Sequence, residues 1–136
     1  MGAWSHEPFG NDTACDWAYG LIESEGFTYI ESTLNAVLSN GSDYIEADEA
    51  EEAIAAIAVI AKLLDGDVQS DAYTEEVDKW VKSLDIKPDQ ELLAKARTVI
   101  DLVLSENSEL LELWQEGDDA EEWKNHIESL KSILAV

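Results

Sequence analysis

Cations are missing from nearly half of this chain. No lysine or arginine occurs from Met1 to Ala61, although the same stretch holds twelve Asp and Glu residues. Over all 136 residues, 31 acids face only 8 bases, and the formal net charge is −23. Proteins bind nucleic acids and anionic membranes through clustered Lys and Arg, and this sequence contains no such cluster. We therefore expect no nucleic-acid or membrane partner, whereas a basic protein remains an open partner class.

Cysteine and long apolar runs are also scarce. Cys15 is the only cysteine, so no intramolecular disulfide can form. The longest apolar run, Ala53 to Ala61, has nine residues, whereas a membrane-spanning helix needs roughly 20. The first ten residues contain neither the basic region nor the apolar region of an export signal. These absences predict a cytoplasmic protein without a leader or membrane anchor.

The chain also lacks the usual patterns of catalytic and cofactor sites. It has no glycine-rich phosphate loop, no nucleophile elbow and no zinc-binding spacing. Neither His6 nor His126 belongs to the Glu-x-x-His pattern of a di-iron helical bundle. Neighbouring carboxylates are unavoidable among 31 acids, so their presence does not identify acid–base catalysis. We expect no cofactor, and a non-catalytic role is favoured while an enzyme remains open.

Helical periodicity runs through most of the sequence. Apolar residues recur at spacings of three and four, and no long alternating strand pattern occurs. An apolar fraction of 46% is enough for one ordinary core. We predict an all-α fold, a single helical domain over residues 1–136, built as a compact bundle of about six or seven short helices. Its central helix is the Ala- and Ile-rich stretch 53–61, which is apolar on every side.

Capping residues indicate where several helices begin and end. Asn11 or Asp12 can accept hydrogen bonds from the free amides of the first helix, and Gly66 is expected to end the third. The helical pattern from Pro88 to Glu116 would make an unusually long helix. We therefore place a break in the polar stretch 105–108.

Two features near the N-terminus are interpreted as packing. Cys15 lies between Ala14 and Trp17, which belong to an apolar stripe, and it is interpreted as a small buried hydrophobe and not as a nucleophile. Trp4 and Phe9 precede the first helix. We expect both aromatic residues to lie on an arm that folds back onto the bundle.

One acidic segment is the first candidate for a binding surface. Residues 43–52 contain six acids in ten positions, directly before the central helix. These acids favour the positive end of the helix dipole, which explains them without any partner. They also form a candidate docking face for a basic protein. The six residues are Asp43, Glu46, Asp48, Glu49, Glu51 and Glu52.

The segment 65–76 is a weak candidate for calcium binding. Oxygen-bearing side chains occupy the offsets that an EF-hand loop uses for its ligands. However, Ser70 stands where the loop requires glycine, and such spacing arises easily in a chain this acidic. The candidate ligands are Asp65, Asp67, Gln69, Asp71 and Glu76, with Tyr73 at the ninth offset.

Several short patterns in the chain occur together in known proteins. The most specific pattern is at the N-terminus, and it consists of Met1-Gly2-Ala3-Trp4, Phe9, Asn11-Asp12, Ala14 and Asp16-Trp17. Further patterns are Asp43 to Leu64, Ser108-Glu109-Leu110, Leu113-Trp114 and Trp123. Together they resemble those of a bacterial protein family described as domain of unknown function 4259. The chain departs from the pattern at Ser5, where glycine is common, and at Gly10, where an acid is common. The resemblance implies a small bacterial protein and supplies no catalytic or ligand residues.

Three hypotheses of function follow from these observations. The first is a non-catalytic interaction module that binds a basic protein through the acidic segment, for example as an inhibitor or an immunity-type protein. The second is a small-ligand binder or enzyme with a buried carboxylate in a pocket between helices, for which Asp12 and Asp16 beside Trp17 are the first acids to inspect. The third is calcium binding at 65–76. The sequence does not indicate an oligomeric state.

Overall fold

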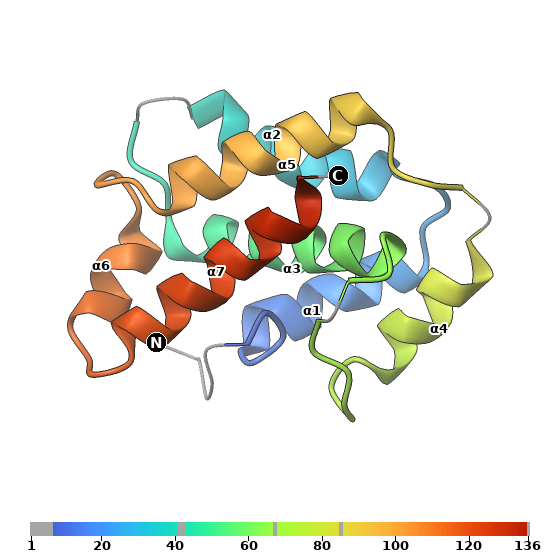
Figure 1. Ribbon diagram of the computed structural model, residues 1–136, viewed down its shortest axis with the longest axis horizontal. Helices are drawn as coiled ribbons and strands as arrows, with labels where there is room; N and C mark the ends of the chain where they lie inside the picture. The colour runs from blue at the N-terminus through green and yellow to red at the C-terminus, as the bar shows by residue number, and fades with distance from the viewer. Residues whose placement is uncertain (1–6, 41–42, 67, 85, 136) are drawn as a thin grey trace.

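Seven helices make up the described part of the chain, which comprises residues 7–40, 43–66, 68–84 and 86–135 of a computed structural model (Figure 1). They are α1 (Asp12–Ile22), α2 (Thr28–Asn40), α3 (Ala47–Leu63), α4 (Glu75–Ser83), α5 (Gln90–Val103), α6 (Glu109–Gln115) and α7 (Ala120–Leu134). The described residues form no strand, and an isolated bridge joins Ile45 to Ser108. The all-α prediction is therefore confirmed.

Helix α3 lies at the centre of the bundle. It contacts each of the other six helices, and every residue from Ala53 to Ala61 is buried. Because five of these nine residues are alanine, neighbouring helices can approach α3 closely. Figure 1 shows α7 crossing in front of α3, with α2 and α5 along one side and α1 along the other. None of the described helices is both long and apolar enough to cross a bilayer.

Side-chain caps set the start of three helices. Asp89 Oδ1 accepts a hydrogen bond from Leu92 N at 2.9 Å and caps α5. Asn11 Oδ1 accepts a hydrogen bond from Ala14 N at 2.7 Å, so Asn11 and not Asp12 caps α1. Ser108 Oγ accepts from Leu111 N at 3.2 Å and starts α6. The predicted break between the fifth and sixth helices is confirmed, because α5 ends at Val103 and the chain turns before Ser108.

The end of α3 differs from the expectation. Gly66 was expected to end the helix, but α3 ends at Leu63, and Asp65 has a left-handed conformation with a φ of 61°. Gly66 N donates to Ala61 O at 2.9 Å. A Cβ on Gly66 would lie 2.7 Å from the side chain of Ile133, so glycine is needed here because α7 packs closely against this turn.

The N-terminal turn is anchored to the bundle by Phe9. Its side chain is fully buried, as predicted, and its backbone N donates to Gln69 Oε1 at 2.8 Å. Trp4 lies outside the described residues. The interpretation of Cys15 as a core residue is wrong: Cys15 is only half-buried, because it lies at the edge of the α1 stripe, beside the fully buried Ala14.

Candidate functional site

The acidic segment 43–52 is divided between the surface and the core. Five of its six acids lie at or near the surface: Asp43, Glu46 and Asp48 are exposed, and Glu49 and Glu52 are half-buried. Glu51 is only 7% exposed. The prediction that Glu51 belongs to the interaction surface is therefore corrected, because residues 47, 50, 51 and 54 share the inward face of α3 at helical spacing.

Backbone and side-chain bonds join the start of α3 to α6. Glu109 N donates to Ile45 O at 3.0 Å, and Glu109 Oε1 accepts from Ala47 N at 2.7 Å. Glu109 thus satisfies a free amide at the start of α3 that Glu46, the N-cap residue, leaves without a side-chain bond. Tyr44 Oη donates to Glu112 Oε2 at 3.4 Å. Acids from two distant parts of the sequence consequently lie on one surface.

We call this feature the anionic surface. Tyr44, whose side chain is 51% exposed, lies within it. None of its acids forms an ion pair with a described Lys or Arg; the ion pairs among described residues use Asp78, Glu75, Glu76 and Asp101. Its negative charge is therefore not neutralised within this part of the protein. The anionic surface consists of Asp43, Tyr44, Glu46, Asp48, Glu49, Glu109 and Glu112.

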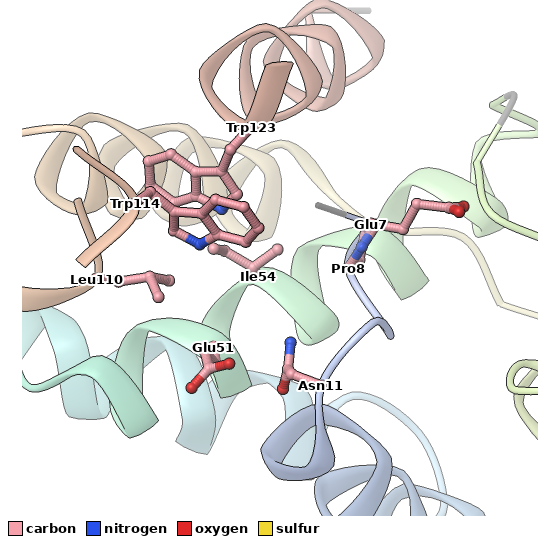
Figure 2. Close-up of a pocket in the computed structure, with 8 residues that line it drawn as sticks. All are labelled: Glu7, Pro8, Asn11, Glu51, Ile54, Leu110, Trp114 and Trp123. Carbon is pink, nitrogen blue, oxygen red and sulfur yellow. The ribbon is translucent and has the colours of Figure 1, made fainter. Parts of the chain in front are cut away.

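Glu51 faces a small cavity between α3, α6, α7 and the N-terminal turn. Figure 2 shows the indoles of Trp114 and Trp123 on one side of this cavity and the side chains of Glu51 and Asn11 on the opposite side. The two indoles are stacked, with ring centroids 5.9 Å apart and planes inclined by 11°. The free space is about 10 Å³, which is the volume that one water needs. Glu7, Pro8, Ile54 and Leu110 complete the lining.

Burial changes the acidity of Glu51. Removal from water raises the pKa of its carboxyl from 4.5 to about 7, and repulsion from Asp48 and Asp12 acts in the same direction. The positive charge of the chain's amino terminus acts in the opposite direction but does not outweigh them. No described Lys or Arg pairs with this carboxylate, and no described residue donates a hydrogen bond to it. Near neutral pH the group therefore exists in both protonation states. A carboxyl of this kind beside a cavity is a candidate for ligand binding.

The loop that precedes α4 is organised by bonds within the protein. Lys62 pairs with Asp78 at 2.7 Å and also donates to Gln69 O. Burial raises the pKa of Asp78, but hydrogen bonds from Lys62, Thr74 and Ser70 outweigh this effect and lower it overall. The ion pair between Asp78 and Lys62 links α4 to the last turn of α3.

The candidate calcium ligands are not gathered around a common point in the described residues. Gln69 is buried, and its amide accepts from Phe9 N and donates to Asp71 Oδ2 at 2.9 Å. Asp65 and Glu76 are exposed, and Asp67 lies outside the described residues. No group of three or more His, Cys, Asp or Glu in the described chain is arranged to hold a metal ion.

The acids of α1 lie at the surface. Asp12 and Asp16 are both exposed. Cys15 lines a groove between α1 and α4, together with the exposed Tyr19 and Tyr73. Burial has the largest effect on the pKa of the Cys15 thiol and raises it. Repulsion from Asp12, Asp16 and Asp71 acts in the same direction. The thiol therefore stays protonated at neutral pH, which argues against a nucleophilic role.

Sequence reasoning missed the cavity at Glu51. It grouped Glu51 with the surface acids, and it gave no reason to expect Trp114 and Trp123 beside one another. One signal was available in the sequence. Glu51 lies four residues after Ala47 and three before Ile54, which is the spacing of one helical face, so it is an acid at a core position. The pairing with residues of α6 and α7 depends on packing and has no signal in the sequence.

Comparisons with known proteins give one match. A family model described as "Domain of unknown function (DUF4259)" matches residues 2–126. Neither the comparison with curated proteins nor that with solved structures found a matching protein.

Proposed function

The chain belongs to the family of domain of unknown function 4259, and on that premise we propose that it is a non-catalytic module that binds a basic protein through its anionic surface. The observation that supports this proposal is the absence of ion pairs between the acids of this surface and the described cations. Carboxylates gathered without a counter-charge attract a cationic partner and repel an anionic one.

The anionic surface also has the composition of a binding interface. Tyr44 stands exposed among the carboxylates, held by its bond to Glu112. Tyrosine is among the residues that contribute most to interface affinity, and it loses little conformational entropy on binding when it is already oriented. An inhibitor or immunity-type protein of a bacterial cytoplasm, occupying a basic partner, is the concrete form that we propose.

Neutralisation of the surface tests the proposal. The variant Asp43→Asn, Glu46→Gln, Asp48→Asn removes three exposed charges from the anionic surface. The matched control Glu23→Gln, Glu25→Gln, Glu128→Gln removes three exposed charges elsewhere. Proteins that the immobilised wild-type protein retains are identified and purified. Their association rates are then measured with the wild type and with both variants. We expect the surface variant to slow association at least tenfold and the control to change it less than twofold.

Salt concentration provides the second measurement. Screening shortens the reach of the charges from about 10 Å at 0.1 M salt to about 3 Å at 1 M. The association rate with the purified partner should therefore fall steeply between these concentrations. Equal association at both concentrations, or equal effects of the two variants, would show that the anionic surface does not mediate binding.

The cavity at Glu51 supports a second candidate function, binding of a small ligand. A buried carboxylate opposite two tryptophans is the arrangement expected of such a site. We place it second because its free space holds only about one water, which is too little for most substrates. This second function is tested by titrating the protein with small molecules and following the indole N–H signals of Trp114 and Trp123 in nuclear magnetic resonance spectra. Absence of any saturable change in these signals would exclude small-ligand binding at the cavity.

A further inference from the structure

A groove lies between α1 and the start of α4, two helices that contact each other (Figure 1). Its volume is about 380 Å³, within the range of about 300 to 1,000 Å³ that is typical of small-molecule sites. None of its described lining residues belongs to the anionic surface or to the cavity at Glu51. We call it the α1–α4 groove, and its lining includes Ala18, Tyr19, Ile22, Tyr73, Glu76 and Val77.

The α1–α4 groove has an apolar floor and one aromatic ring on each side. Ala18 and Val77 are buried and form the floor. Tyr19 extends from α1 and Tyr73 from the turn before α4, and these side chains are 70% and 56% exposed. Large apolar side chains are exposed at four of the described positions, and two of the four line this groove. Exposed aromatic side chains gathered around an apolar depression are typical of a binding site.

Both sides of the groove are held in place by hydrogen bonds within the protein. Asp71 N donates to Thr74 Oγ1 at 3.0 Å, and Tyr73 N donates to Asp71 Oδ1 at 2.9 Å, so the turn that carries Tyr73 is fixed. At the other end of α4, Trp80 Nε1 donates to Ser24 O at 3.1 Å, just after the end of α1. A site whose backbone is already ordered loses little conformational entropy when a ligand binds.

The charge around the groove is negative. Glu76 lies on its rim, and no lysine or arginine is among the described residues that line it. Lys79 pairs with Glu76 at 3.4 Å, but both side chains are more than 60% exposed, so water screens this pair. Burial raises the pKa of the Cys15 thiol in the groove, and so do the charges of three more carboxylates, those of Asp12, Asp16 and Asp71. An anion is therefore repelled from the groove and a cation is attracted.

We propose that the α1–α4 groove binds a small organic cation with an apolar body, of the class of aralkyl quaternary ammonium ions. The charged head lies against the rings of Tyr19 and Tyr73, whose electron-rich faces attract a positive charge, and the apolar body covers the floor. A quaternary head suits these walls because it needs no hydrogen-bond acceptor, whereas a primary ammonium is strongly hydrated. This ligand is distinct from the basic protein proposed for the anionic surface.

Benzyltrimethylammonium chloride is the direct probe. Nitrogen–proton correlation spectra follow the backbone amide signals of residues 15–22 and 72–77 during a titration. A ligand of about eleven heavy atoms is expected to bind with a Kd of about 0.1 to 5 mM. Three comparison compounds each change one feature at equal ionic strength. Benzyl alcohol has no charge, benzoate has the opposite charge and tetramethylammonium has no apolar body. We expect each of them to bind at least tenfold more weakly.

Variants of exposed residues test the two contacts without disturbing the core. Tyr19→Leu removes the ring and should lower the affinity at least threefold, whereas Tyr19→Phe keeps the ring and should lower it less than twofold. Tyr44→Leu, at an exposed tyrosine outside the groove, is the matched control and should have no effect. Glu76→Gln should lower the affinity at least twofold. Its control is Glu75→Gln, because Glu75 also pairs with Lys79 but does not line the groove.

Four results would overturn the proposal. Equal affinity for tetramethylammonium would mean general attraction to a chain of net charge −23, and equal affinity for benzyl alcohol would mean apolar contact alone. Wild-type affinity in Tyr19→Leu would remove the aromatic contact. Groove signals that move on dilution of the protein alone would show that a second copy covers the groove. None of these results bears on the anionic surface, which is judged by the variant at positions 43, 46 and 48.

Discussion

Replacement of Glu51 by glutamine should stabilise the protein, and more so at high pH than at low pH. Glutamine has nearly the same shape as glutamate but no charge. The unfolded chain ionises Glu51 near pH 4.5, whereas the folded protein does so near pH 7. Between these values the folded state binds more protons, so the contribution of Glu51 to stability falls as the pH rises through this range and stays low above it.

The magnitude follows from the same two pKa values. The difference between 4.5 and about 7, at about 1.4 kcal/mol per pKa unit, corresponds to about 3 kcal/mol. Water at the open side of the cavity screens part of the charge, so we expect a measured gain of about 1 to 3 kcal/mol for Glu51→Gln at pH 8. At pH 5 the gain should be under about 1 kcal/mol. For a chain of this length the gain at pH 8 raises Tm by about 3 to 10 °C.

Urea unfolding followed by circular dichroism measures this prediction. Wild type, Glu51→Gln and the control Glu128→Gln are compared at pH 5 and pH 8, both above the isoelectric point of about 4.1. Glu128 is exposed, so its replacement should change stability by less than about 0.5 kcal/mol at either pH. An equal gain for Glu51→Gln at both pH values, or a loss of stability at pH 8, would refute the assignment of Glu51 as a buried carboxyl with a raised pKa.

Three further predictions concern the fold, and all are measured by urea unfolding. Ser108→Ala removes the cap of α6 and should lower the free energy of unfolding by about 1 kcal/mol. Equal stability of Ser108→Ala and wild type would contradict the cap. Ile57→Ala, in the fully buried centre of α3, should lower it by about 2 to 5 kcal/mol; a loss below 1 kcal/mol would mean that the site is not core. Gly66→Ala should lower the free energy of unfolding by about 1 to 3 kcal/mol, and Ile133→Ala should restore part of this loss by removing the side chain that the new methyl group meets. If the losses of the two single variants simply add in the double variant, the two residues are not in contact.

The helical architecture could be predicted because its signals are local. The stretch from Ala53 to Ala61 is apolar on all sides, and only a position surrounded by other helices buries such a segment. Likewise, the cap at Asn11 and the break before Ser108 depend on residues within one turn. The reason for a glycine after α3 was less predictable, because the close approach of Ile133 from α7 to Gly66 joins residues far apart in the sequence.

The candidate site was predicted only in part. The concentration of acids in 43–52 is visible in the sequence, but the addition of Glu109 and Glu112 requires the bridge between Ile45 and Ser108, which joins residues more than 60 positions apart. Similarly, an inter-helix pocket with a buried carboxylate was one of the hypotheses, yet the acid in question is Glu51 and not Asp12 or Asp16.

By itself, the sequence determined the helical class, the central position of the Ala- and Ile-rich segment and the negative charge, because these properties follow from composition and from spacing along one chain. Tertiary structure alone decided which acid is buried, which tryptophans lie opposite it and which acids share a surface. These properties depend on contacts between α3, α6 and α7. Contacts in space decide which side chains are buried, so the glutamate at position 46 is exposed, whereas the one at position 51 is buried and burial raises its pKa to about 7.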